Sequence, residues 1–490
     1  MTSRTRQPNP LSLAVALIGL SVASGANAAQ FNARAAISPS VSWTDNICAT
    51  ESNKKHGYVA TATPSGSLTA RGKRASLTLS GHVQVNSLTN SQLNDRGCSG
   101  EELRENRKQY RPKVRASGNV DVIRQKLTVN YGARWDQNQI NSRLSGGDDP
   151  FDRNGTGNNW VRYNISPTFR HRFPNLGNIN LRYSYDELIN DKNKANDSVR
   201  QQVSANFNAK GTQRFSWGLS ARHSQVEYQN PTITAIPRRD TELQNARFNA
   251  SYQIGRFLGI NGSIGKEWNN LLNPRFDDDG ISWQLGLRWT PTRRTAVSIG
   301  SGDRFFGKTP RIQLTHKAKR GTLNVNYNKK ITYDRDILTS DDGLLPDFGQ
   351  NDSLRSRSPI IDERVTFSYN HQAGSSNLTF AGYYSEQTRT LDNQMGTFKN
   401  FGVTYQPQLS TRFGVSFLVN WTESTPRQRS GIIEFEGNTS EVWTYSASLS
   451  RPINNRLSTT LTYQFTDRST DQAVGDYQEN RITATLSISL

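Results

Sequence analysis

Eleven basic side chains recur at alternating positions within segments that otherwise alternate polar and apolar residues. They are Arg34, Lys113, Arg115, Arg162, Arg170, Arg182, Arg222, Arg247, Arg288, Arg311 and Lys317. Guanidinium and ammonium groups gathered on one wall raise the local concentration of anions and can bind carboxylates directly. The same residues would also serve only to keep a wide water-filled space hydrated, and the sequence favours neither interpretation.

The sequence contains no convincing catalytic motif. The six histidines are scattered, no pair of them has the spacing of a zinc-binding helix, and no Gly-x-Ser-x-Gly elbow occurs. Acidic residues gather in segments 147–152, 277–279 and 341–342 without the full spacing of a calcium loop, so solvated loop charge is the favoured interpretation. We therefore expect no enzymatic activity, no cofactor and no resident metal.

Strict alternation of polar and apolar residues predicts strands along the whole chain. In segment 75–85, for example, Ala75, Leu77 and Leu79 fall on one face, and Ser76 and Thr78 fall on the other. About 22 such segments can be counted between residues 33 and 479, each near the ~9–11 residues that cross a bilayer when tilted. Merging or splitting of segments would place the number between 18 and 22.

The composition separates a transmembrane barrel from other classes. The chain has 490 residues, a net charge of +19 and only 33% hydrophobic residues, yet it carries 9 Trp, 17 Tyr and 20 Phe. A strand with one face toward lipid and one toward water averages to a polar composition while retaining many aromatics. The sequence contains no apolar run of 18 residues, so it predicts no membrane-spanning helix. Nucleic-acid binding is not expected, because the basic residues lie along strands of a secreted protein. The predicted fold is an all-β, antiparallel, up-and-down transmembrane β-barrel.

The first residues predict export. Arg4 and Arg6 precede an apolar stretch from 11 to 23, and Ala26-Asn27-Ala28 is typical of a cleavage site. We expect a secretory signal peptide at 1–28 and an outer-membrane β-barrel at 29–490. The partners expected are outer-membrane lipid, lipopolysaccharide and the outer-membrane assembly machinery, with an anionic polysaccharide as a further candidate.

The connections between the predicted strands alternate between short turns and longer loops rich in Asp, Asn, Gly and Ser. In bacterial outer-membrane barrels the short turns are periplasmic and the long loops extracellular. An even number of strands then places both termini in the periplasm. Six tryptophans at the long-loop ends predict an aromatic girdle at the membrane interface: Trp43, Trp135, Trp268, Trp283, Trp421 and Trp443. Trp160 does not fit the outward alternation of its strand.

Cys48 and Cys98 are the only two cysteines, and both fall in long loops. In an oxidising envelope a disulfide is the expected state, with free thiols or metal ligands as alternatives. Such a bond would connect two neighbouring loops at the rim.

Residues 35–47, which run from Ala35 through Pro39 and Trp43 to Thr44-Asp45-Asn46-Ile47, resemble the start of barrel proteins associated with exopolysaccharide and exosortase (PEP-CTERM) systems. The resemblance implies an outer-membrane barrel of porin type linked to surface polysaccharide, without assigned catalytic residues. Together with the basic lumen it suggests a passive porin or export conduit for anionic solutes, such as an acidic exopolysaccharide. The alternative is a non-conducting barrel that anchors a polysaccharide or surface-protein assembly system.

Overall fold

The structure is a computed structural model of the chain. The model describes residues 30–89, 108–139, 157–191, 197–229, 240–271, 279–339, 359–390, 395–408, 410, 412–430, 433–436, 439–471 and 475–490. The predicted signal peptide at 1–28 therefore lies outside the described residues.

The described chain is almost entirely strand. The strands are β1 (Gln30–Thr44), β2 (Gly57–Arg71), β3 (Ala75–Thr89), β4 (Lys108–Ile123), β5 (Leu127–Gln139), β6 (Gly157–Phe173), β7 (Gly177–Asn190), β8 (Ser198–Ala209), β9 (Phe215–Tyr228), β10 (Thr241–Gln253), β11 (Leu258–Asn270), β12 (Asp279–Thr292), β13 (Thr295–Arg304), β14 (Gly307–Lys308), β15 (Arg311–Lys317), β16 (Gly321–Tyr333), β17 (Pro359–Ala373), β18 (Ser376–Arg389), β19 (Met395–Gln406), β20 (Gly414–Ser430), β21 (Ile433–Glu436), β22 (Ser440–Pro452), β23 (Leu457–Thr470) and β24 (Tyr477–Ser489). One short helix, α3 (Asp334–Leu338), follows β16 directly.

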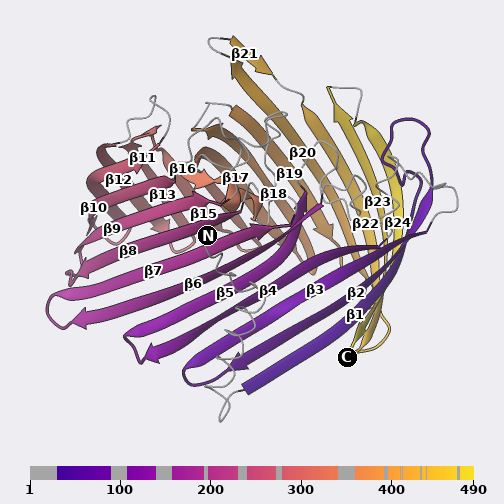
Figure 1. Cartoon of the computed structure of the whole chain (residues 1–490), viewed down its shortest axis with the longest axis horizontal. Coiled ribbons are helices and arrows are strands. Elements are labelled where there is room, and N and C mark those ends of the chain that lie inside the picture. Colours follow the sequence, from indigo (N-terminus) through magenta and orange to yellow (C-terminus); the bar gives the residue numbers. More distant parts are fainter. Residues whose placement is uncertain are drawn as a thin grey trace, which may run out of the picture.

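The strands form one closed antiparallel barrel (Figure 1). Each strand of the ring pairs with its neighbours in the chain, and β1 pairs with β24, from Ala36 opposite Ser489 to Thr44 opposite Arg481. The two shortest strands, β14 and β21, pair only with the ends of β13 and β20, whose remaining lengths pair with β15 and β22, so 22 strands make up the ring. Closure leaves no unpaired sheet edge, which is a requirement for backbone in contact with lipid. The predicted fold class and strand number are confirmed.

The connection between β13 and β15 departs from the predicted alternation of short turns and long loops. It lies at the long-loop end of the barrel, yet only β14 and a few turn residues separate the two strands. Gly307 allows this tight reversal because its φ of 95° is strained for other residues. Phe306 is buried in the turn, with the Arg304 guanidinium 4.8 Å from its ring centroid.

The two faces of the wall differ in the expected way. On β12 the large apolar side chains all point outward and are exposed at the protein surface, from Trp283 and Leu285 to Leu287 and Trp289. Residues directly opposite each other on paired strands share a face, so the pairing register assigns a face to every strand residue. The outer face carries the apolar and aromatic residues, and the lumenal face is polar.

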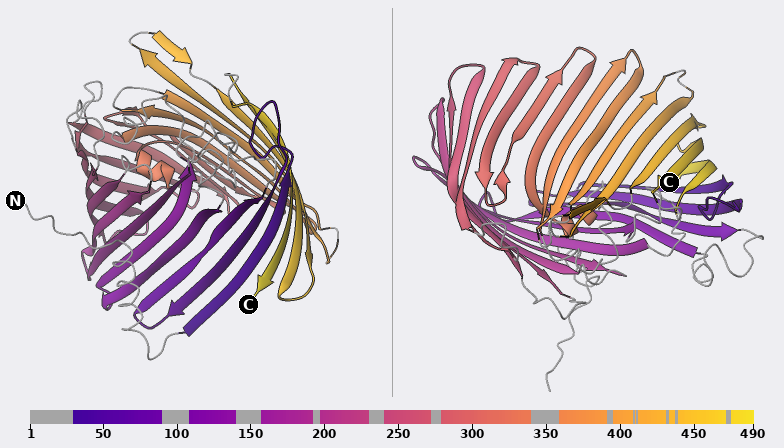
Figure 2. Two further views of the ribbon diagram at one scale, coloured as in Figure 1. Left: turned by 45° about the vertical axis from the view of Figure 1, so that its right-hand side comes forward. Right: turned by 90° about the horizontal axis from the view of Figure 1, so that it is seen from above.

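The segment after β16 leaves the wall and enters the lumen. Figure 2 shows α3 inside the ring, near the wall formed by β5 to β8. Tyr333, the last residue of β16, is buried with Val226 and Tyr228 of β9. No helix in the described part of the chain is long and apolar enough to cross a membrane.

One tyrosine on the outer face ties three strands together. Tyr131 of β5 lies opposite Gly118 of β4, and its hydroxyl donates to the carbonyl oxygen of Ser76 on β3 at 3.2 Å. A Cβ atom at Gly118 would collide with that carbonyl oxygen and with the tyrosine hydroxyl. Glycine is therefore required where the ring crosses the strand.

Candidate functional site: an arginine cluster inside the barrel

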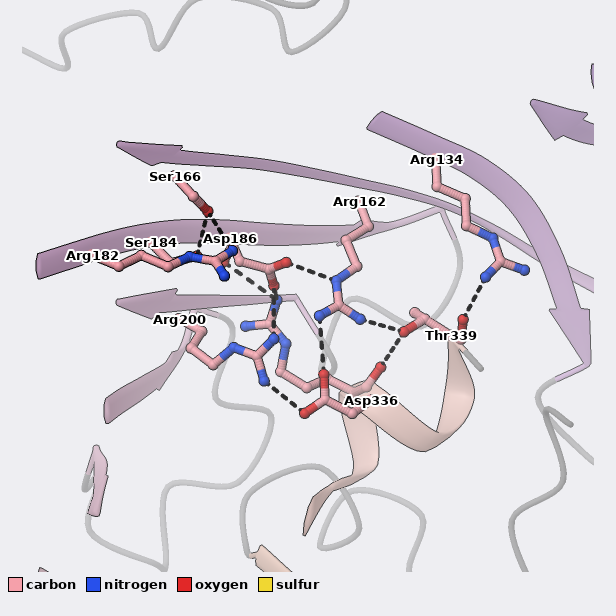
Figure 3. A network of polar contacts seen from close by, with 10 residues as sticks. Arg134, Arg162, Ser166, Arg182, Ser184, Asp186, Arg200, Asp336 and Thr339 are labelled. Atoms are coloured by element: carbon pink, nitrogen blue, oxygen red, sulfur yellow. Dashed lines mark hydrogen bonds and ion pairs between the residues drawn. The ribbon is translucent and has the colours of Figure 1, made fainter. Parts of the chain in front are cut away.

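The site is centred on Asp186 of β7, whose carboxylate faces the lumen and is almost fully buried. It accepts a hydrogen bond from Arg162 Nε at 2.9 Å (Figure 3). It also forms an ion pair with Arg335 of α3. The Arg335 side chain has no solvent exposure. A buried guanidinium without a carboxylate would be strongly unfavourable, so Asp186 accounts for the position of α3 against this part of the wall.

Asp336, the next residue of α3, is held by two arginines of the wall. Its Oδ1 atom lies 3.0 Å from Arg162 Nη2 on β6, and its Oδ2 atom lies 2.7 Å from Arg200 Nη1 on β8. Each carboxylate oxygen therefore has its own guanidinium partner. Arg200 also lies 3.8 Å from Asp186, directly opposite on β7, so the same carboxylate orients both arginines.

Thr339, which follows α3, completes the attachment. Its hydroxyl accepts from Arg162 Nη1 at 2.7 Å and donates to the carbonyl oxygen of Arg335 at 2.8 Å. Its carbonyl oxygen accepts from Arg134 Nη1 on β5 at 2.8 Å. The Arg134 guanidinium lies 5.1 Å from the ring centroid of Trp160, which is buried on the lumenal face. Trp160 thus points inward, which explains why it does not fit the outward alternation.

These neighbours change the pKa values of Asp336 and Arg335. Burial alone would raise the pKa of the Asp336 carboxyl, but Arg200, Arg162 and Arg335 together lower it below its ordinary value. Burial lowers the pKa of the Arg335 guanidinium, and Asp186 opposes that change. Among the described residues the Nε and Nη1 atoms of Arg335 are buried and have no hydrogen-bond partner.

Two further arginines point into the lumen beside these ion pairs and have no carboxylate partner among the described residues. Arg182 of β7 donates to Ser166 Oγ at 3.2 Å, and Arg222 of β9 donates to Gln202 Oε1 at 2.6 Å. Both lie opposite Ser204 on the strand between them. We call the set formed by Arg134, Arg162, Arg182, Arg200, Arg222 and Arg335 the arginine cluster. Its carboxylates in the described structure are Asp136, Asp186 and Asp336, so positive charge is in excess.

A second ion-paired group borders the cluster. Glu267 of β11 is buried and pairs with Arg247 of β10 and, at 2.9 Å, with Arg304 of β13. Its Oε2 atom has no partner in the part of the chain that the structure describes. The lumenal wall from β5 to β13 is therefore basic and contains few acids.

The register places all eleven predicted basic residues on the lumenal face. One row of directly opposed residues runs from Arg34 through Ser67, Ser80, Arg115 and Arg134 to Arg162. Only Arg162, Arg182 and Arg222 of the predicted set belong to the arginine cluster. The others, which lie elsewhere on the same face, are Arg34, Lys113, Arg115, Arg170, Arg247, Arg288, Arg311 and Lys317. Anion binding by the set stays a prediction.

Several residues of the site were missed by sequence analysis. Arg134 and Arg200 share the alternation of the predicted residues, so the existing rule could have included them. Arg335, Asp336 and Thr339 carry no strand signal, because they follow the end of β16. Their place in the lumen depends on a contact with β7, about 150 residues earlier in the chain.

The six girdle tryptophans Trp43, Trp135, Trp268, Trp283, Trp421 and Trp443 all lie on the outer face by register. Trp421 and Trp443 are directly opposed, and both indole nitrogens donate to Glu441 Oε1 at 2.7 Å. An interfacial role for these residues stays a prediction. Cys48 is disulfide-bonded. Because Cys98 lies outside the described residues, its pairing with Cys48 also stays a prediction.

The ring of 22 strands, the polar lumen and the apolar outer face define an outer-membrane-type barrel of the size found in transporters with plugged lumens. No protein-family model and no curated protein sequence matches the chain.

Among solved structures, the chain is similar to the FrpB iron transporter of Neisseria meningitidis (F5-1 variant), with a TM-score of 0.54, 9% identity and coverage of 94% of this chain and 82% of that one. It is also similar to the siderophore receptor PirA of Acinetobacter baumannii, with a TM-score of 0.51, 8% identity and coverage of 93% and 80%. A mutant of the ferric enterobactin receptor PfeA of Pseudomonas aeruginosa gives a TM-score of 0.52, 10% identity and coverage of 94% and 80%. At these identities the likeness shows the fold alone, which is that of a 22-strand outer-membrane-type barrel.

This comparison corrects the functional prediction. The chain was expected to be a passive porin or an export conduit, with an anchoring barrel as the alternative. The similar structures reported above are named as an iron transporter, a siderophore receptor and a ferric enterobactin receptor, not as porins or polysaccharide conduits. The short N-terminal resemblance correctly implied an outer-membrane-type barrel, but nothing supports its link to exopolysaccharide systems.

Proposed function

We propose that the protein is a receptor-type outer-membrane transporter that captures an anionic solute on the arginine cluster. The observation that carries this proposal is the excess of guanidinium groups on one stretch of lumenal wall, where Arg182 and Arg222 have no carboxylate partner among the described residues. Arginine binds oxyanions bidentately and retains its charge at any physiological pH.

An anionic ferric chelate suits such a site. The proteins with this architecture are named as receptors for siderophores and ferric enterobactin, and those names supply the substrate class for the proposal. Ion pairs in the lumen lose less to solvent screening than ion pairs on an open surface, because the cluster is partly buried. A concave wall with converging charged donors is also the usual form of a ligand site.

In this proposal the short turns and both chain termini face the periplasm, and the long loops are extracellular. The expected partners are outer-membrane lipid, lipopolysaccharide and the assembly machinery. The protein is a transporter and not an enzyme.

The test is a binding titration with purified, refolded protein in detergent, with ferric enterobactin as the probe. Replacement of Arg182 and Arg222 together by Gln should weaken binding at least about tenfold, because charge-assisted hydrogen bonds contribute about 1.5–3 kcal/mol each. The matched control is Arg34→Gln with Lys113→Gln, which removes two lumenal charges outside the cluster and should change affinity less than about twofold. Absence of saturable binding, or equal losses in the two double variants, would overturn the proposal.

A further inference from the structure

The carboxylate of Asp336 lies within the arginine cluster of the lumenal wall. It lies between Arg162 of β6 and Arg200 of β8 and forms an ion pair with each of them. Figure 3 shows that both guanidinium groups point away from the wall toward α3. A carboxylate that accepts from two arginines is the arrangement expected of a bound acidic ligand.

The wall would hold this geometry without α3. Asp186 accepts from Arg162 Nε and lies 3.8 Å from Arg200. It belongs to the wall itself, on β7 between the strands that carry the two arginines. With α3 withdrawn, Arg162 and Arg200 would share the carboxylate of Asp186, and the donors that now bind Asp336 would point into the lumen unpaired. Such a site favours another anion, because unpaired charge in a partly buried environment is costly.

The helix that supplies Asp336 is a weak structural element by itself. It has five residues, and the side chain of its N-cap residue, Tyr333, makes no capping hydrogen bond. Isolated helices of this length do not persist in water. In the described part of the segment, Arg335, Asp336 and Thr339 contact the wall through their side chains, and Tyr333 packs beside them. Two of the donors of Arg335 remain unpaired among the described residues even in the docked state.

We propose that Asp336 is an internal competitor for a carboxylate-bearing ligand, which takes its place between Arg162 and Arg200 and thereby releases α3. The inference rests on the proposed function, whose solute is anionic, and adds to it the oxyanion site and the element that the solute displaces. A ligand must then displace the intramolecular carboxylate before it binds, so a weakly charged solute binds this site poorly.

The experiment uses iron-free citrate as a simple polycarboxylate at neutral pH, titrated by calorimetry into the full-length refolded barrel. The Asp336→Asn variant keeps the shape of the side chain and removes its charge, so it should bind citrate at least about tenfold more tightly than wild type. Asp336→Glu retains the carboxylate and should bind as wild type does. Asp121→Asn, which alters a lumenal acid on β4, is the matched control and should have no effect.

Adding Arg162→Gln and Arg200→Gln to Asp336→Asn should abolish the gain. Unchanged, weaker or absent citrate binding in Asp336→Asn would overturn the inference, and so would a gain that survives loss of both arginines. Each of these results is independent of whether ferric enterobactin binds through Arg182 and Arg222, so the two proposals fail separately.

A second measurement needs no variant at position 336. In wild type, citrate should accelerate amide hydrogen exchange in residues 333–339 and change the part of the fluorescence that is lost in Trp160→Phe, because Arg134 links Thr339 to Trp160. Slower or unchanged exchange at saturating citrate would show that the ligand binds without displacing α3 and would overturn the proposal.

Discussion

Arg134 and Arg162 lie directly opposite each other on β5 and β6, so two guanidinium groups face the lumen from neighbouring strands. Like charges in this position destabilise a sheet unless something compensates them. Arg134 pairs with Asp136 at 2.7 Å on its own strand, whereas Arg162 depends on Asp186 and on Asp336 of α3. Asp186 therefore provides one anion next to Arg162 from the neighbouring strand, and Asp336, far along the chain, provides a second.

Replacement of Asp186 by Asn should release α3 while leaving the barrel intact. The change leaves Arg335 and Arg162 without their shared carboxylate, and breaking a buried ion pair costs about 3–5 kcal/mol. Amide hydrogen exchange in residues 333–339 should rise sharply, with strand exchange unaltered. Asp121→Asn, at a lumenal acid that accepts from Thr128 at 2.8 Å, serves as the control. Retained protection of 333–339 in the Asp186 variant would contradict the role assigned to this carboxylate.

Docking of α3 should persist in mild acid and fail only in strong acid. The pKa of Asp336 is lower when α3 is docked than when it is free, so docking stabilised by its charge is fully present above the ordinary aspartate pKa of about 4 and is lost as pH falls through the lower, docked value. Exchange in residues 333–339, corrected for the intrinsic pH dependence, should be constant from pH 7 to pH 5 and should rise below about pH 4. The Asp336→Asn variant should lack this transition. Release already near pH 6 would point to a different titrating group.

The two faces of β12 should respond oppositely to a new charge. Leu285 points outward and is 58% exposed at the protein surface, whereas Gln284, its neighbour in the chain, points into the lumen. Leu285→Arg should lower the free energy of unfolding in lipid vesicles by about 2–4 kcal/mol, the cost of a basic residue near the bilayer midplane. Gln284→Arg should lower it by less than about 1 kcal/mol. Equal effects of the two substitutions would be inconsistent with lipid on the outer face.

Gly118 should tolerate no side chain. The Cβ of Gly118→Ala would collide with the backbone carbonyl of Ser76 and with the hydroxyl of Tyr131, so the ring must move and its hydrogen bond is lost. We expect a loss of about 1–3 kcal/mol, the usual range for overpacking. Gly280→Ala on β12 is the control, because nothing lies within 4 Å of a Cβ built there. Thermal unfolding followed by the heat-dependent shift in gel migration would compare the two. A Gly118 variant as stable as the Gly280 variant would show that the close contact has no energetic weight.

The barrel could be predicted from the sequence because its main signal is local. Alternation along β12 or β24 specifies both the strand and its two faces, and the even number of strands follows from counting. The same alternation predicts that Arg162, Arg182 and Arg222 lie on the lumenal side.

The site itself could not be predicted in the same way. Which arginines gather depends on where residues 333–339 turn inward, and that depends on the contact of Arg335 with Asp186 across the lumen. Nothing near Asp336 in the sequence indicates which strands it will face. The function was predicted wrongly for a related reason, since a polar, basic lumen does not by itself distinguish one kind of barrel from another.

Closure of the ring between β1 and β24 has a consequence for the order of assembly. Thr44 donates to Glu479 Oε1 at 2.6 Å across this seam, and the two residues are 435 positions apart. Contacts between such distant residues form slowly because a long loop of chain must close first. Until the last strand is in place, both β1 and the newest strand expose unpaired backbone donors and acceptors, which readily pair with other chains. The seam is therefore the point at which a partly built barrel is most prone to aggregate.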